Sequence, residues 1–170
     1  MPWQPAEVVH QHDVRKLCVS AYHGHKQGCP NHGKKEGCPP KAPLLSDICD
    51  PVYPTFVIWN RFEFGEHVAR MKELHPQWSD YQLACCLYWQ GTARKTLGVQ
   101  LKEFELFKPV YSVTTCPEGM GVNVTETMKR LGVELEWPPV KYAYQVAVGF
   151  VRLPKKKEVI DELPPSTTEG

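Results

Sequence analysis

Three of the seven cysteines in this chain are followed directly by proline, and two of them form a short repeat, Gly28-Cys29-Pro30 and Gly37-Cys38-Pro39. The third is Cys116-Pro117. A proline after a cysteine fixes the backbone and removes an N–H group, and the glycine before it allows a tight turn. Each thiol is therefore presented from a stiff loop, which indicates a metal site.

The chain of 170 residues is long enough for one domain whose core needs no disulfides. Its 20 lysines and arginines against 19 aspartates and glutamates give a formal charge of +1, so no overall charge directs it to nucleic acid or to an anionic membrane. An odd number of cysteines and a start without a signal-peptide pattern predict a cytoplasmic protein whose thiols bind metal. No apolar run is long enough to span a membrane.

Composition divides the chain into three parts. Residues 1–50 are rich in Gly, Pro, His, Lys and Cys with little apolar periodicity, so we expect loops wrapped around a ligand. Residues 51–154 show the periodicity of an α/β core, and residues 155–170 are polar and aperiodic, as in a disordered tail. The sequence therefore predicts a single metal-binding domain over residues 1–154.

Hydrophobic periodicity predicts strands and helices within the core. Ser79 and Gln82 predict a capping box at the start of the second helix, which is apolar over much of its circumference and is expected to run through the core. The fold class is α+β, or α/β, with a small mixed sheet and about three helices. The expected strands are 52–59, 110–114, 133–137 and 142–153, and the expected helices are 65–74, 80–96 and 125–131, with 99–107 resuming as helix.

Cys29 and Cys38 are the strongest candidate metal ligands. Their neighbours, such as Asn31, His32 and Lys34, are polar and offer no apolar face that a buried thiol would join. Nearby lysines favour the thiolate, because a positive charge lowers the pKa of a cysteine. Ligation is therefore favoured over ordinary burial for this pair.

Cys116 and Cys18 complete the predicted set of four ligands. Cys116 shares the Cys-Pro dipeptide and is expected at the carboxyl end of a strand. Cys49 is set aside because its two aspartate neighbours would resist thiolate formation. Cys85 and Cys86 lie in a predicted apolar helix and are interpreted as buried thiols.

The sequence leaves the identity of the metal open. Four thiolates can close a tetrahedral zinc site or hold an iron–sulfur cluster, and the cysteine spacings match no standard zinc or ferredoxin motif. Three ligating cysteines would leave one iron of a 4Fe-4S cluster open to substrate or water. His23, His25 and His32 offer a zinc site of three cysteines and one histidine instead, although each is favoured as a solvated side chain. A third alternative is a protein without metal.

Further candidates lie outside the cysteines. Trp89 and Arg94 would suit stacking on a nucleotide or nucleic-acid base and contact with its phosphate, but a core tryptophan beside a solvated basic turn is favoured. Gly119 and Gly121 precede a short predicted helix and would suit an anion at its N-terminus. Glu118, beside a predicted ligand, is the best candidate for a catalytic carboxylate, although no nucleophile and base can be assembled from the sequence.

Two segments resemble a known family. The stretch Gly28 to Pro40, GCPNHGKKEGCPP, resembles the signature of a family of small uncharacterised prokaryotic predicted metal-binding proteins, Cys-Pro-x-(aromatic or His)-Gly-Lys followed by Cys-Pro-Pro. The stretch Thr115 to Val124 is similar to the family's second block, Cys-Pro-Glu followed by Met-Gly-(Ile/Val)-(Asp/Asn)-Val. The matches span most of residues 28–137.

This resemblance implies a cysteine-bound metal centre at Cys29, Cys38 and Cys116. The chain departs from the family pattern at Cys18, which an insertion containing His23 and His25 displaces from the first block. It also lacks the extra cysteines that relatives carry before the second block. The resemblance therefore leaves the fourth ligand open.

Together these features predict a cysteine-ligated metal protein carrying a 4Fe-4S cluster, used for electron transfer or for a non-redox sulfur or oxygen substrate. The alternative is a zinc-stapled binding or adaptor protein. In that protein a structural site of four cysteines, or of three cysteines and one histidine, replaces missing core in the first fifty residues. The sequence assigns no reaction, small-molecule substrate or redox partner. A homodimer is expected only from the general frequency of such assemblies.

Overall fold

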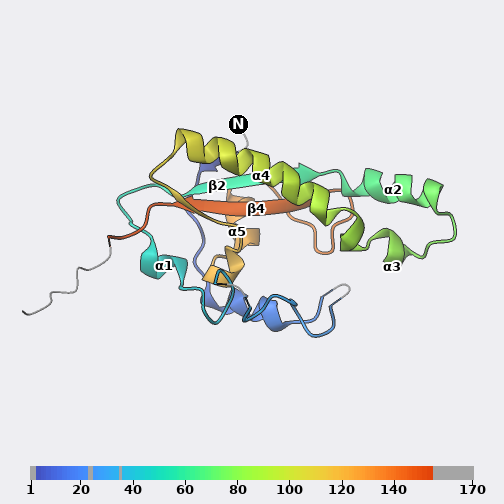
Figure 1. Cartoon of the computed structure of the whole chain (residues 1–170), viewed down its shortest axis with the longest axis horizontal. Helices are drawn as coiled ribbons and strands as arrows, with labels where there is room; N and C mark the ends of the chain where they lie inside the picture. Colours follow the sequence, from blue (N-terminus) through green and yellow to red (C-terminus); the bar gives the residue numbers. More distant parts are fainter. Residues whose placement is uncertain (1–2, 23–24, 35, 155–170) are drawn as a thin grey trace, which may run out of the picture.

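The fold is built on an antiparallel sheet with helices on both faces (Figure 1). The computed structural model describes residues 3–22, 25–34 and 36–154. Within this part of the chain the sheet has the strand order β1-β2-β4-β3. Its strands are β1 (Trp3–Pro5), β2 (Phe56–Phe62), β3 (Ser112–Thr114) and β4 (Ala143–Phe150).

The two central strands, β2 and β4, are buried on both faces. Side chains alternate across a strand, so paired residues share a face. Val57 pairs with Val148 and contributes to the core on one side of the sheet, whereas Ile58 pairs with Ala147 and contributes to the other. This two-sided burial explains why β2 has an apolar run without alternation.

One face of the sheet is covered by the long helix α4 (Gln90–Phe107) (Figure 1). Leu97 and Phe104 are buried there against Ile58 and Ala147. The helix runs unbroken through Gly98 and ends at its C-cap residue, Lys108. Proline follows this cap in the sequence, so the predicted stop at Lys108-Pro109 is confirmed.

The opposite face carries α5 (Val124–Arg130) and the cysteine-rich N-terminal segments (Figure 1). Met120, Val122 and Met128 are buried against the sheet on this side. The expected loop region contains short regular elements besides β1. They are the 3-10 helix η1 (His12–Val19) and the α-helix α1 (Leu45–Ile48). Further along the chain, the turn before α5 contains the 3-10 helix η3 (Glu118–Met120).

An arm extends from one end of the sheet (Figure 1). It consists of α2 (Phe64–Leu74), α3 (Asp80–Leu83) and the 3-10 helix η2 (Cys86–Tyr88). The capping box is confirmed, because Ser79 and Gln82 exchange hydrogen bonds at the start of α3. The single helix expected over 80–96 is wrong.

That expected helix breaks because Trp89 packs against the end of β2. The Trp89 ring stacks on Phe62 at a centroid distance of 5.4 Å, and its Nε1–H donates to the Ala84 carbonyl at 3.3 Å. A continuous helix would not bring the indole back to the Ala84 carbonyl. Leu87 is consequently 84% exposed, so the segment does not run through the core as expected.

Two of the predicted strands also need correction. The first begins at Phe56 rather than at position 52, and Val52 is 81% exposed. The segment 133–137 is not a strand, because its polar groups serve local structure: the Glu136 carboxylate accepts hydrogen bonds from the backbone N–H groups of Val140 and Lys141, both at 2.7 Å.

The α+β class is confirmed, with the sheet antiparallel rather than mixed throughout the described strands. The predicted helices 65–74 and 125–131 are confirmed to within one residue at their starts, and Gly132 follows α5 with the positive φ of 76° expected for a residue after a helix end. No helix in the described ranges is both long and apolar enough to cross a membrane. The predicted tail, 155–170, lies outside the described residues.

Replacing Gly149 by alanine tests the packing of α4 on the sheet. A Cβ atom there would lie 2.7 Å from two carbons of the buried Phe104 ring, so we expect Gly149→Ala to lower the free energy of unfolding by about 1–3 kcal/mol. Gly98→Ala is the control, since its Cβ meets nothing within 4 Å and should stabilise α4 by about 1 kcal/mol. Urea unfolding of both variants measures the difference, and equal stabilities would contradict this packing.

His67 makes stability depend on pH. Burial, and secondly the Arg70 guanidinium, lowers the pKa of His67 below its ordinary value of 6.5. The unfolded chain therefore binds more protons than the folded one as the pH falls through 6.5, and stability is lost in that direction. We expect the loss between pH 7 and pH 5 to be smaller in His67→Phe. Chemical unfolding at several pH values measures it, and parallel pH profiles for both proteins would refute the assignment.

Candidate metal centre

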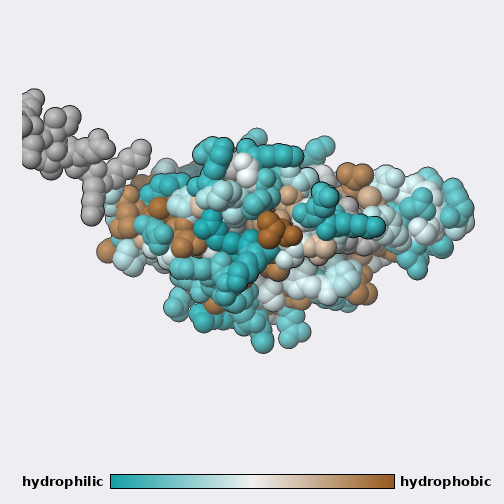
Figure 2. Space-filling model, turned by 90° about the horizontal axis from the view of Figure 1, so that it is seen from below, coloured by the Kyte–Doolittle hydropathy of each residue, from teal (hydrophilic) through white to brown (hydrophobic). Residues whose placement is uncertain are grey.

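The four predicted ligands lie on three chain segments on the side of the sheet that carries α5. These segments are the end of η1, the loop from position 28 to position 40, and the turn that follows β3. Seen from this side, the surface is largely hydrophilic (Figure 2). Short backbone hydrogen bonds join the segments to one another, and Val8, Ala42 and Leu45 beside them are buried in the core on this face.

Cys18 and Cys29 are joined through the backbone. The Cys29 N–H donates to the Cys18 carbonyl at 2.8 Å. Gly28 precedes this bond with a φ of +81°, and a Cβ atom on it would lie only 2.7 Å from the Cys18 oxygen. The glycine before the first Cys-Pro dipeptide is therefore required both for its conformation and for this close approach.

The loop between Cys29 and Cys38 folds back on itself. The Gly33 N–H donates to the Pro39 carbonyl at 2.8 Å, and the His32 N–H donates to the Cys29 carbonyl at 3.1 Å. These bonds bring the two ends of the loop toward each other. Cys38 is buried, with 7% of its surface exposed.

Cys116 follows β3 by two residues, as predicted, and reaches the loop through Gly119. The Cys116 N–H donates to the Thr114 hydroxyl at 3.2 Å, which sets the turn. A Cβ atom on Gly119 would lie 3.2 Å from Pro39, 3.3 Å from the Gly37 carbonyl and 3.8 Å from the Cys116 Cβ. The second Gly-Cys-Pro triplet is therefore packed directly against the Cys116 turn.

The four thiols and Glu118 share one electrostatic neighbourhood. The pKa of Cys18 is raised first by burial and then by the negative charges of Cys29, Glu118, Cys38 and Cys116. Burial also raises the pKa of the Glu118 carboxyl. Both effects favour the neutral, protonated forms of Cys18 and Glu118 over their anions.

The donor set suits thiophilic metals. All seven cysteines are free thiols, which leaves the four sulfurs available as ligands. Nothing in the parts of the chain that the structure describes forms a group of three or more histidine, cysteine, aspartate or glutamate side chains arranged to hold an ion. Coordination would therefore require the loops to close further around the metal.

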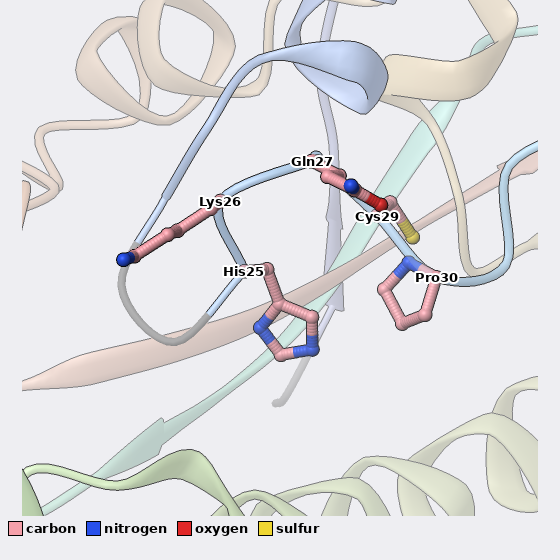
Figure 3. A pocket seen from close by; sticks show the side chains of 6 residues that line it. His25, Lys26, Gln27, Cys29 and Pro30 are labelled. Carbon is pink, nitrogen blue, oxygen red and sulfur yellow. The ribbon is translucent and has the colours of Figure 1, made fainter.

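A pocket of about 440 Å³ opens beside Cys29 (Figure 3). Next to it, Tyr22 and His25 exchange two backbone hydrogen bonds and stack their rings at a centroid distance of 4.6 Å. Burial raises the pKa of Tyr22, and so do the nearby Cys29 and Cys86, while Arg94 acts in the opposite direction. The lining residues of the pocket are His25, Lys26, Gln27, Gly28, Cys29 and Pro30.

The other candidates have structural roles or lie apart. Trp89 is buried in the core, the interpretation favoured from the sequence, whereas Arg94 is exposed on α4. Gly121 has a φ of +79° and packs against Leu44 and His12, and the N-terminus of α5 is capped by the side chain of Asn123.

Two histidines and three cysteines remain to be placed. His32 is exposed and His23 lies outside the described residues. Burial, and secondly Asp50, raises the pKa of Cys49, in line with the predicted resistance to thiolate formation. Cys85 and Cys86 are only partly buried, since the helix expected to bury them is broken.

Sequence reasoning missed an electrostatic link between Tyr22 and Arg94. The charge of Arg94, on α4, lowers the pKa of Tyr22 against the effects of burial and of Cys29, and no periodicity of the sequence links these residues. The two glycines of the Gly-Cys-Pro repeat could be recognised in the sequence, because a glycine at such a position indicates that two backbone segments approach closely.

Comparison of the chain with protein families, with curated proteins and with solved structures finds no match.

Gly28→Ala tests whether the Cys18–Cys29 contact holds the site together. Gly28 and Gly33 both have positive φ, but only a Cβ at Gly28 would meet the neighbouring backbone. We expect Gly33→Ala to cost about 1 kcal/mol for the strained conformation and Gly28→Ala to cost clearly more. Thermal unfolding compares the two variants, and equal losses would show that the segments do not approach in this way.

Proposed function

We propose that this chain is a cysteine-ligated metal protein carrying a 4Fe-4S cluster, used for electron transfer or for binding a sulfur or oxygen substrate. The observation that carries the proposal is the gathering of Cys18, Cys29, Cys38 and Cys116 from three distant segments into one neighbourhood. Thiols in a protein of this length have no need to gather for stability. Their convergence, without a disulfide, is typical of ligation.

A cluster suits this arrangement for two reasons. Cysteine is the usual ligand of 4Fe-4S clusters, and three of the four charged groups that raise the pKa of Cys18 are cysteines, the other being Glu118. A cubane also binds each thiolate at a separate iron, so it can join loops that do not meet at a single point. The Cys-Pro dipeptides support the same interpretation, because they hold three of the sulfurs on stiff backbone.

The second candidate is a structural zinc site. The segments carrying Cys18, Cys29 and Cys38 bury few large side chains: among the described residues from 15 to 41, those that are buried are Gly28, Cys38 and Pro39. Where little core exists, the free energy of zinc binding becomes free energy of folding. His25, beside Cys29 in the pocket lining, offers a variant of this site with three cysteines and one histidine.

Serine substitution of single cysteines tests the proposal and counts the ligands. Protein purified without oxygen should be brown and contain about four irons with acid-labile sulfide per chain. Cys29→Ser, Cys38→Ser and Cys116→Ser should each lose most of this iron. Cys49→Ser is the matched control, since Cys49 is also partly buried but is not among the groups that raise the pKa of Cys18. Iron and sulfide assays with absorption spectra provide the measurement.

The remaining outcomes separate the alternatives. One zinc per chain, lost in the same three variants, would replace the cluster by the structural site. Full iron retention in Cys18→Ser would show that three cysteines suffice and that one iron is open. Metal content unaffected by all four substitutions would refute a cysteine-bound centre of either kind.

A further inference from the structure

Cys18 and Cys29 are held within bridging distance of each other by the backbone. The Cys29 N–H donates to the Cys18 carbonyl at 2.8 Å. Standard backbone dimensions add about 4 Å at most to this separation, so the two Cα atoms lie within about 7 Å of each other. Disulfides join Cα atoms that are about 4.4–6.8 Å apart. The two backbone segments are therefore close enough for a disulfide.

The contact extends over the residues next to the pair. A Cβ atom on Gly28 would lie 2.7 Å from the Cys18 oxygen and also from the Cα and carbonyl carbon of Val19. The Gly28 N–H donates to the His25 carbonyl at 3.2 Å, which holds the turn. In Figure 3 the chain leaves η1, turns and passes beside it again at Gln27. The approach therefore involves several backbone atoms and does not depend on a single hydrogen bond.

Both cysteines carry free thiols that a small oxidant can reach. Neither Cys18 nor Cys29 is fully buried. Leu17 and Val19, on either side of Cys18, are more than half exposed, and a pocket opens beside Cys29. Reversible oxidation of cysteine requires such access to solvent.

We propose that Cys18 and Cys29 form a reversible disulfide when the chain meets hydrogen peroxide. Peroxide oxidises one sulfur to a sulfenic acid with release of one water, and the other sulfur displaces the second oxygen as water, so two thiols and one peroxide become one disulfide and two waters. A dithiol reductant reverses the reaction. The inference rests on the proposed function for one statement: because both use the same two sulfurs, disulfide and metal exclude each other, and oxidation releases the metal.

The competing explanation is that cysteines close in the sequence become linked whatever the fold. Cys29 distinguishes the two explanations, since it lies 11 positions after Cys18 and nine positions before Cys38. An unfolded chain closes the shorter loop at least as readily as the longer one. Linkage by sequence proximity would therefore give Cys29–Cys38 at least as often as Cys18–Cys29, whereas the fold favours Cys18–Cys29.

Peptide mapping of the full chain, purified without oxygen and then treated with hydrogen peroxide, identifies the link. After the remaining thiols are blocked, trypsin places Cys18 in peptide 17–26, Cys29 in 27–34 and Cys38 in 36–41, so each link gives a different pair of joined peptides. We expect 17–26 joined to 27–34 to exceed 27–34 joined to 36–41 by about tenfold or more. The preference should disappear when the same reaction is run in concentrated urea.

Variants test whether the backbone approach causes the preference. Gly28 and Gly33 both have positive φ, but only a Cβ at Gly28 would meet the neighbouring backbone. We expect Gly28→Ala to lower the yield of the Cys18–Cys29 link about tenfold and Gly33→Ala to leave it unchanged. Cys49→Ser, which removes a half-buried thiol outside the pair, should also leave it unchanged.

A main link between any other two cysteines, equal product ratios in buffer and in urea, or equal yields from the two glycine variants would overturn the inference. Metal analysis of the same samples keeps its failure separate from that of the proposed function. Cysteine-dependent metal without a Cys18–Cys29 link refutes the disulfide alone, and the link in a chain without metal refutes the proposed centre alone. We expect released metal to rise with the linked peptide, and a link formed with all metal retained would contradict their exclusion.

Discussion

The approach of Gly119 to Gly37 and Pro39 is the contact on which the site depends. The space for a Cβ at Gly119 is occupied by the Pro39 ring and the Gly37 carbonyl, so the two backbones can meet only where a side chain is missing. Met120 and Val122, just beyond Gly119, are buried in the core beneath the sheet. One turn therefore connects a loop of polar sequence to the rigid part of the fold.

Further backbone bonds fasten the N-terminal segment to the same turn. The Gln11 N–H donates to the Gly121 carbonyl and the Asn123 N–H donates to the Val9 carbonyl, each at 2.8 Å. The Thr127 hydroxyl of α5 accepts from the Val9 N–H at 3.0 Å. The cysteine-bearing segments are thus anchored to the core on one side and exposed to solvent on the other. This arrangement would allow the proposed ligands to close around a metal.

The elements that were predictable from the sequence are those whose signals are local. The Ser79–Gln82 capping box and the glycine after α5 are set by residues three or four positions apart, and the structure confirms both. The segment 133–137 alternates like a strand, but Glu136 binds the backbone ahead of β4, and no local pattern reveals that partner. The same distinction applies to the candidate site. The Cys-Pro repeat can be recognised in the sequence, whereas the effect of Arg94 on the pKa of Tyr22 depends on where the fold places α4.

The electrostatics around Cys18 show what a metal would have to overcome in order to bind at the proposed centre. Besides burial, the negative charges of the three Cys-Pro cysteines and of Glu118 raise the pKa of Cys18, so each of them makes the Cys18 thiolate less stable. Burial has the same effect on the Glu118 carboxylate. While these groups keep their protons they carry no charge and do not repel one another, whereas each ionisation makes the next one less favourable. A bound metal would reverse the sign of these interactions, because it binds thiolates and releases their protons. The proposed centre therefore predicts that metal binding at these cysteines strengthens as the pH rises.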